Sequence, residues 1–354
     1  MTESTIAASD ESPVQPAAVI LPLLVVGVIA AFLLSVALGP IPITLSEIGA
    51  ALTGGTVDAM LRDVILDLRI PRSLMALAVG AVLAAGGTAM QGLFRNPLAD
   101  PTLIGVSGGA ALAAASFIVF GASIPFIPDS LRLYAMPVAA FLGGMVVVLV
   151  IQRLAQRDGR TDIATMLLAG IAVNAVVMAG IGLLTFIGND AQLRTINFWM
   201  LGSLGGSGWG PLSAVGPVSV VVVLACLGLA RVLDGMMLGE REAQTLGFNV
   251  ETTKRLLIIA VAAGVGTAVA FSGVIVFVGI VAPHMIRIAI GPAHRALLIG
   301  AALLGGILIL LADTLCRLIV APAELPIGIV TSLLGAPFFL ALLIGRSRSF
   351  GDGA

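Results

Sequence analysis

The stretch GPVSVVVVLACLGLA, residues 216–230, has no charged side chain and decides the fold class. A second apolar run, RLLIIAVAAGVGTAVAF, follows at 255–271, and the polar stretch GEREAQTLGF lies between them at 239–248. A helix needs roughly 20 apolar residues to cross a bilayer, and run after run of this chain approaches or reaches that length. The pattern predicts an integral membrane protein with many spanning helices. The polar stretch at 239–248 then needs an explanation, because it lies between two predicted spans.

The overall composition agrees with this class. Of 354 residues, 59% are hydrophobic and only 10% are charged, whereas soluble domains carry about 25% charged residues. The mean hydropathy is +1.13. The small-residue runs GAVLAAGGTA (80–89) and AALLGG (301–306) have the spacing that tightly packed membrane helices use at their contacts. The two cysteines, Cys226 and Cys316, lie in or beside apolar runs and are expected to be packing residues.

Proline, glycine and charged residues divide the apolar runs into about ten predicted spans. They lie near 18–39, 71–93, 99–121, 132–152, 163–188, 211–232, 256–274, 276–291, 295–316 and 326–345. The third and eighth are the weakest, because they are glycine-rich or interrupted by proline. We therefore predict an all-α, polytopic fold with one transmembrane domain at 18–345. A cytoplasmic N-terminal tail is expected at 1–17 and a cytoplasmic C-terminal tail at 346–354.

The basic residues predict the orientation, because inner loops of membrane proteins are enriched in Lys and Arg. With both termini in the cytoplasm, twelve of the 18 basic residues fall on the inner side and six on the outer side. The outer six are Arg62, Arg69, Arg72, Arg132, Arg194 and Arg317. The first 17 residues contain no Lys or Arg, unlike a secretory signal. The run at 18–39 is therefore expected to be a retained helix.

Several catalytic chemistries are excluded by the residues that the chain lacks. A phosphate-binding P-loop needs Gly-Lys-Ser/Thr, but Lys254 is the only lysine and follows Thr253. His284 and His294 are the only histidines and are too isolated for a zinc site; for His284 a backbone hydrogen bond is the expected role. The sequence thus predicts no catalytic residue, no metal ligand, no cofactor bound by this chain, and no nucleic-acid partner.

A carrier coupled to protons or sodium usually buries carboxylates in the membrane. Here only Asp313 comes close, and Arg317 follows one turn later, so a local i,i+4 ion pair is the preferred interpretation. An ion-coupled transporter or a channel acting alone remains an alternative of a different class. The sequence favours a transporter that receives its energy from another protein.

Two long stretches give the chain a family resemblance. RIPRSLMALAVGAVLAAGGTAMQGLFRNPLADPTLIGVSGGAALA at 69–113 closely resembles the first half of the FecCD family, the iron-chelate, heme and cobalamin permeases of type II ABC importers. The stretch from VFVGIVAPHMIR to SLLGAPFF, at 276–339, resembles its second half. LGEREAQTLGFNV lies between them, where the family has its coupling helix.

The resemblance implies a ten-helix subunit that forms a homodimer around one pathway in the bacterial inner membrane. Two copies of a cytoplasmic ATPase, which hold ATP and magnesium, and a periplasmic binding protein are the implied partners. The implied coupling element is Gly239, Glu240, Arg241, Glu242, Ala243, Gln244, Thr245, Leu246 and Gly247. From the residues alone, 240–246 fits two helical turns with Gly247 as a left-handed cap, and an ordinary solvated connection is the alternative.

The resemblance also implies contact and pathway residues. Arg69, Arg72 and Arg317 match positions that meet acidic residues of the binding protein, and we expect them to form exposed charge pairs. The implied gate and pathway residues are Asn96, Leu98, Ile163, Ala164, Asn174, Met178, Phe198, Trp199 and Met200. Ile163 and Ala164 depart from the small hydroxyl residues of the cobalamin branch. The stretch DAQLRTINFWMLGSLGGSGW at 190–209 looks most like the heme-importing branch, with a ferric siderophore or cobalamin as alternative ligands.

Overall fold

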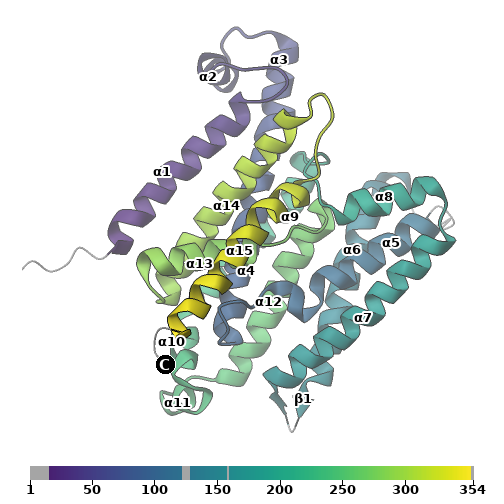
Figure 1. Ribbon diagram of the computed structural model, residues 1–354. Helices are drawn as coiled ribbons and strands as arrows, with labels where there is room; N and C mark the ends of the chain where they lie inside the picture. The colour runs from purple at the N-terminus through teal and green to yellow at the C-terminus, as the bar shows by residue number, and fades with distance from the viewer. Residues whose placement is uncertain (1–15, 122–127, 158, 352–354) are drawn as a thin grey trace, which may run out of the picture.

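The computed structural model describes residues 16–121, 128–157 and 159–351, and it is almost entirely helical (Figure 1). Ten helices correspond to the predicted spans: α1 (Pro16–Ala37), α4 (Ile70–Leu93), α5 (Val106–Phe120), α6 (Asp129–Leu154), α7 (Ile163–Ile187), α9 (Trp209–Gly228), α12 (Val250–Ser272), α13 (Val278–Ile290), α14 (His294–Ile319) and α15 (Ile327–Gly351). The shorter elements are α2 (Leu45–Thr53), α3 (Ala59–Asp63), the π-helix η1 (Val64–Arg69), the 3-10 helix η2 (Pro101–Ile104), α8 (Asp190–Met200), α10 (Ala230–Leu238), α11 (Glu240–Thr245) and the strands β1 (Gln156–Arg157) and β2 (Arg160–Thr161).

The predicted all-α membrane fold is confirmed. Among the residues that the structure describes, seven helices are long and apolar enough to cross a membrane, and three shorter apolar helices, α5, α13 and the first part of α15, accompany them. Two of these short helices are the spans that looked weakest in the sequence. The predicted start of the third span at 99 was wrong: η2 and a left-handed Gly105 precede α5. Helix α15 continues to Gly351, past the predicted end of the transmembrane domain at 345 and into the predicted C-terminal tail.

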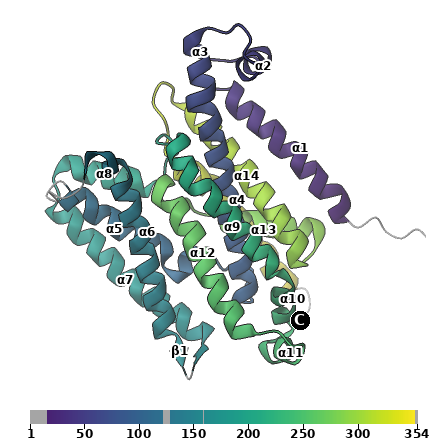
Figure 2. The same cartoon turned by 180° about the vertical axis from the view of Figure 1, so that it is seen from behind.

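Helix α4 lies at the centre of the bundle, with α9, α12, α13 and α14 around it (Figure 2). It packs most extensively against α14, and the contact is made through glycines. A Cβ atom on Gly80 would overlap the carbonyl of Gly305, and a Cβ on Gly305 would overlap the carbonyl of Gly80. The backbones can approach this closely only because both positions lack a side chain. The small-residue runs noted in the sequence therefore form the central helix contact.

The bundle has two distinct ends (Figure 1). One end, here the α8 end, carries α2, α3 and α8. The opposite end, here the α11 end, carries α10, α11 and the antiparallel β1–β2 pair, in which Gln156 faces Thr161. Because α4 and α6 run toward the α11 end and α14 runs away from it, the loops separate into two sets as the sequence predicts.

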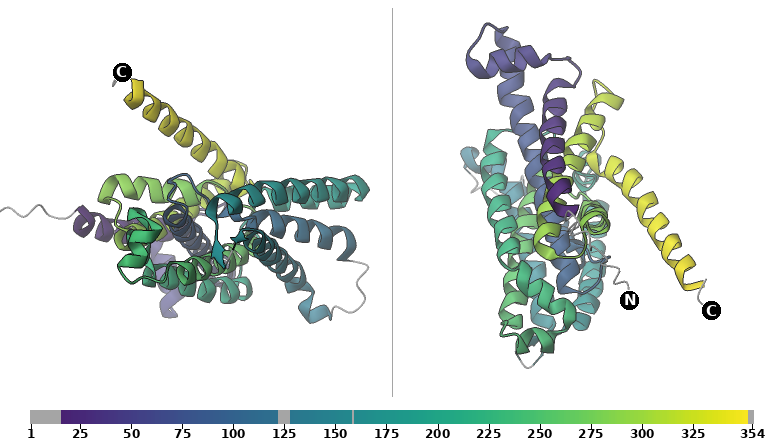
Figure 3. Two further views of the ribbon diagram at one scale, coloured as in Figure 1. Left: turned by 90° about the horizontal axis from the view of Figure 1, so that it is seen from below. Right: turned by 90° about the vertical axis from the view of Figure 1, so that its left-hand side faces the viewer.

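Several helices keep large apolar faces uncovered, among them α7 and α15. Helix α7 exposes Leu168, Ile171, Met178 and Phe186, and α15 exposes Leu333, Leu334 and Leu340. Helix α15 leans away from the rest of the bundle (Figure 3). Its most extensive contacts are with α13 and α14. These faces require lipid or another protein surface to cover them.

Candidate functional site

At the α11 end, the polar stretch between two spans forms a short helix, as its sequence predicted. Helix α11 follows α10 after Gly239, and Gly247 has the expected left-handed backbone, with φ of 86°. Ala243 is fully buried against α10, while Arg241, Glu242 and Gln244 are exposed. Leu246, 61% exposed, also faces away from the protein. The element thus has one anchored side and one side that is available to a partner.

A polar network fastens α11 to the body. The Lys254 ammonium lies 2.7 Å from the Glu240 carboxylate and donates to the carbonyl of Thr161 at 3.1 Å. Thr161 in turn donates through its backbone N and its hydroxyl to Glu251. The only lysine of the chain therefore joins α11, α12 and β2. The sequence showed that this lysine was unique but gave no sign of its partners.

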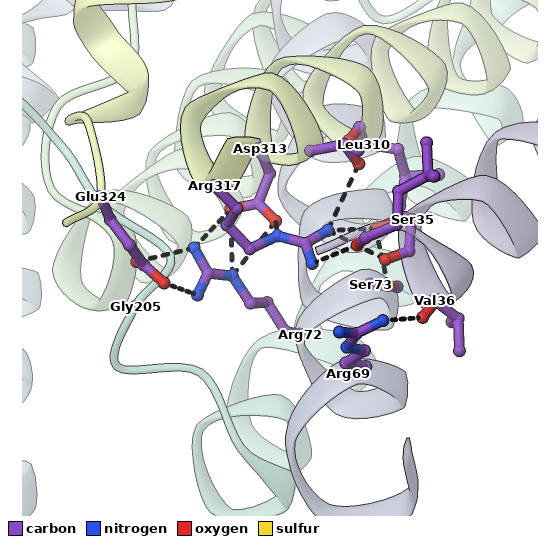
Figure 4. Close-up of polar contacts among 12 residues, drawn as sticks. Ser35, Val36, Arg69, Arg72, Ser73, Gly205, Leu310, Asp313, Arg317 and Glu324 are labelled. Carbon is purple, nitrogen blue, oxygen red and sulfur yellow. Dashed lines mark hydrogen bonds and ion pairs between the residues drawn. The ribbon is translucent and has the colours of Figure 1, made fainter. Parts of the chain in front are cut away.

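At the α8 end, three arginines form one cluster with the end of α1 (Figure 4). Arg69, at the end of η1, donates to the backbone carbonyls of Val36 and Ala37, at 2.7 and 2.9 Å, and to that of Ile41. Its side chain is buried, with 7% of the residue exposed. It therefore satisfies carbonyls that the end of a helix leaves without an intrahelical partner.

Arg317 plays a similar part from α14. It donates to the carbonyls of Ser35 and Leu38, at 2.9 and 3.0 Å, and pairs with Asp313 at 3.0 Å. The predicted i,i+4 pair is confirmed. Arg317 is only 6% exposed, so it joins α1 to α14 in the interior.

Arg72 bridges two carboxylates. Its guanidinium lies 2.8 Å from buried Asp313 and 2.7 Å from Glu324, in the loop before α15. The hydrogen bonds from Arg72 hold the pKa of the Glu324 carboxyl below its ordinary value. Glu324 is the more exposed partner. Sequence reasoning missed this residue, although it lies within the stretch 276–339 that carries the family resemblance.

The expectation that all three arginines form exposed charge pairs is therefore wrong. Arg69 and Arg317 are buried because α1 carbonyls and Asp313 occupy their donors, and Arg72 is largely enclosed by its two carboxylates. Of the three, Arg72 is the one whose other partner, Glu324, lies at the surface.

The predicted gate residues lie at turns near the α11 end. Asn96 accepts a hydrogen bond from the backbone N of Leu98 at 3.0 Å, which fixes the turn after α4. Ile163 packs on the core at the start of α7, and the neighbouring Ala164 is exposed.

The remaining predicted pathway residues do not form a single surface. Met178 is on the exposed face of α7, whereas the half-buried Asn174 points its side-chain oxygen at Gly108 of α5. Phe198 and Trp199 of α8 line one cavity of about 400 Å³. Its other lining residues include Tyr134, Met136, Phe271, Ser203 and Glu324. Met200 instead packs on the cluster around Ile196.

The described part of the chain has no group of three His, Cys, Asp or Glu residues that could hold a metal ion. His284 lies edge-on to Phe338, with 6.1 Å between ring centroids. Cys226 and Cys316 are buried free thiols, as expected of packing residues. The candidate functional features are therefore the exposed side of α11, the arginine cluster and the cavity beside α8.

Comparison with known proteins identifies the family. A model of the FecCD transport family matches residues 27–345. The chain belongs to the FecCD transport family. This FecCD chain is 49% identical over 291 residues to the hemin transport system permease protein HmuU of Yersinia pestis, which covers 81% of this chain and 85% of that protein. It is 40% identical over 279 residues to the cobalamin import system permease protein BtuC of Halobacterium salinarum, over 79% of this chain and 73% of the relative.

A solved structure agrees with both sequence matches. A chain described as an inward-facing conformation of a metal-chelate type ABC transporter superposes with a TM-score of 0.81 at 30% identity, over 92% of this chain and 99% of that chain. The FecCD protein is therefore a multi-pass permease subunit of a type II ABC importer. It has no ATPase site of its own, and an ATPase and a substrate-binding protein are its partners.

Proposed function

We propose that this permease imports heme. The observation that carries the proposal is the 49% identity to a hemin permease, which extends over most of both chains. The cobalamin permease is less similar, at 40%, and cobalamin and a ferric siderophore are the alternative ligands. Heme fits a pathway with apolar walls because its ring is large and flat and its two carboxylates remain at one edge.

The proposed orientation places the α11 end in the cytoplasm and both termini on that side of the inner membrane. The positive-inside rule supports it, since twelve basic residues belong to that side and six to the other. The α8 end then faces the periplasm, where the binding protein delivers its ligand.

On the cytoplasmic side, α11 is proposed to seat in the ATPase, which holds ATP and magnesium. The element from Gly239 to Gly247 is tied to the body through Glu240 and Ala243 and presents Leu246 outward. An exposed apolar side chain on a short polar helix suits a groove in a soluble partner. The anchored side provides a path by which movement of the ATPase reaches the membrane helices.

On the periplasmic side, Arg72 is the proposed docking residue. An acidic residue of the binding protein would replace Glu324 as the partner of the Arg72 guanidinium. Arg317 would hold Asp313, the second partner of Arg72, in place, and Arg69 would hold the end of α1. This assigns the three arginines different tasks within one docking site. Exchange of one carboxylate for another conserves the charge balance of the cluster, so docking costs little desolvation.

The uncovered faces of α7 and α15 are proposed to line a pathway between two copies of this chain. Exposed Met178 and Phe186 on α7 and Leu333 on α15 make apolar walls without a strong iron ligand. Neither histidine belongs to α7 or α15. Heme would thus cross a weakly binding surface, which favours release.

Ligand-dependent ATP hydrolysis tests the proposal. The purified complex of permease, ATPase and binding protein in lipid nanodiscs is given heme, a ferric siderophore or cobalamin, and the hydrolysis rate is measured. We expect the heme-loaded binding protein to stimulate hydrolysis most. Stimulation by cobalamin or the siderophore alone would assign the permease to another branch of the family.

A further inference from the structure

Asp234 and His294 form a partly buried contact at the α11 end that the proposed function does not use. A single oxygen of Asp234, on α10, accepts hydrogen bonds from the backbone N of His294 at 2.9 Å and from its ring Nδ1 at 2.7 Å. The imidazole is 3% exposed, while the Asp234 side chain is 44% exposed. A carboxylate only accepts, so the ring carries its proton on Nδ1.

The contact supplies a cap that α14 lacks in its own sequence. Ala293 occupies the N-cap position and makes no side-chain hydrogen bond. Helix N-termini leave backbone N–H groups unsatisfied and favour a negative charge nearby. Asp234 meets both needs from another helix, so α10 is attached to the first residue of α14.

The His294 ring also contacts α4 near the predicted gate. A Cβ atom on Gly92 would lie 2.5 Å from His294 Nε2 and 3.1 Å from a methyl carbon of Leu233 on α10. Gly92 is in the last turn of α4, and the turn that contains Asn96 follows directly; the backbone N of Arg95 donates to the Gly92 carbonyl at 3.2 Å. The last turn of α4, the middle of α10 and the first residue of α14 therefore meet at one imidazole.

Helix α10 and helix α11 pack directly against each other. Gly239 alone separates them, and the ring of Phe248, just after α11, packs on Gly235 of α10 with 3.0 Å to its Cβ position. A displacement of α11 would therefore act on α10. Asp234 makes a polar connection from α10 to His294 of α14, whose ring lies against Gly92 of α4.

We propose that the Asp234–His294 pair transmits movement of the ATPase-bound α11 to the inner ends of α4 and α14, and so to the turn that holds Asn96. Both are positioning residues: neither touches the ligand or ATP. The proposal rests on the proposed role of α11 as the ATPase-coupling element. It predicts that loss of the pair separates ATP hydrolysis from transport while the complex stays assembled.

The test uses the whole complex in proteoliposomes, with heme uptake and ATP hydrolysis measured on the same sample. Asp234→Ala removes the acceptor, and Asp234→Asn keeps an acceptor oxygen in its place. Arg231→Ala, at an exposed position one turn earlier on α10, is the matched control. We expect Asp234→Ala to reduce heme moved per ATP at least fivefold, with normal assembly and basal hydrolysis. Asp234→Asn should recover most of the ratio, and Arg231→Ala should match the wild type.

Two outcomes would overturn the proposal. One is an unchanged ratio of heme to ATP in Asp234→Ala. The other is loss of ATPase assembly or of permease stability in that variant, which would make the pair a structural cap only. Heme uptake by the wild-type complex distinguishes failure of this proposal from failure of the proposed function. A wild-type complex that moves no heme refutes the ligand assignment, whatever the variants do.

Discussion

Arg317 is enclosed at the point where α1 and α14 meet, and its guanidinium donates to Asp313, to the Ser35 carbonyl of α1 and to the Leu38 carbonyl just after α1. Replacing it with alanine removes a donor from the Ser35 and Leu38 carbonyls and leaves Asp313 with Arg72 as its remaining arginine partner. Breaking a buried ion pair costs about 3 kcal/mol. We expect Arg317→Ala to lower the free energy of unfolding of the purified permease by about this amount, measured by denaturation in detergent. Arg194→Ala, at an exposed position of α8, should change it by less than about 0.5 kcal/mol. An Arg317→Ala permease as stable as the wild type would make this arginine a docking residue only.

Glu324 competes, in our account, with the acidic residue of the binding protein for Arg72. Exposed ion pairs contribute about 0.2–1 kcal/mol, so Glu324→Gln should tighten binding of the loaded binding protein by roughly two- to fivefold. The depressed pKa of Glu324 sets the sign with pH: its contact with Arg72 is fully present above the ordinary carboxyl pKa and weakens as pH falls through the lowered value. Surface binding measurements at several pH values check both statements. Weaker binding by Glu324→Gln would mean that Glu324 itself contacts the partner.

The residue contacts show what local spacing reveals and what it does not. Asp313 and Arg317 are four residues apart, so helical geometry predicted their pair. Arg72 and Asp313 are 241 residues apart, and only the packing of α4 on α14 brings them together. Lys254 with Thr161 and Asp234 with His294 are likewise far apart in the sequence and meet only through the packing of the folded chain. The sequence identified charged residues of interest but placed the arginines on the surface because it could not supply their partners.

At the scale of elements, α11 is expected to be the contact with the ATPase. Leu246→Asp places a charge at an exposed apolar position, so folding should be unaffected while a partner groove would have to bury the carboxylate. We expect at least a tenfold loss of ATPase copurified with the permease. Leu45→Asp, on the equally exposed Leu45 of α2, is the control at the opposite end. Normal assembly and transport by Leu246→Asp would exclude α11 as the coupling element.

The α4–α14 contact depends on the absence of side chains. Gly80→Ala forces a methyl group into the carbonyl of Gly305, and overpacking of this kind costs about 1–3 kcal/mol. Gly49→Ala, in α2, meets nothing within 4 Å and should be neutral or stabilising by about 0.5 kcal/mol, because alanine favours helix. Thermal unfolding of both variants in detergent compares them. Equal stability would show that α4 and α14 are not in close contact in the membrane.

Helix existence was predictable because each span carries its own apolar signal. The ends were harder. The start of α5 depends on η2 and Gly105, and the strands β1 and β2 lie in a polar connection whose sequence has no strand pattern. The end of α15 is set by continued helix formation through RSRS, a stretch whose charge suggested a tail. Hydropathy marks membrane segments but does not mark where a helix continues into water.

At the scale of the whole molecule, our proposal gives each end of the bundle a distinct task. The α8 end gathers the arginine cluster, and the α11 end gathers the coupling element and the Asp234–His294 pair. Between them stand α7 and α15, whose apolar faces remain uncovered in one subunit. This arrangement suits a permease that receives a ligand at one end, energy at the other, and a second copy of itself along the side.

Heme uptake into proteoliposomes tests this account most directly. The vesicles contain the permease and its ATPase, with heme-loaded binding protein outside and ATP with magnesium trapped inside. We predict heme accumulation in the lumen that requires ATP and the binding protein, and that exceeds uptake of a ferric siderophore or cobalamin delivered in the same way. Heme uptake that proceeds without ATP, or ATP-driven uptake of cobalamin or a siderophore in place of heme, would contradict it.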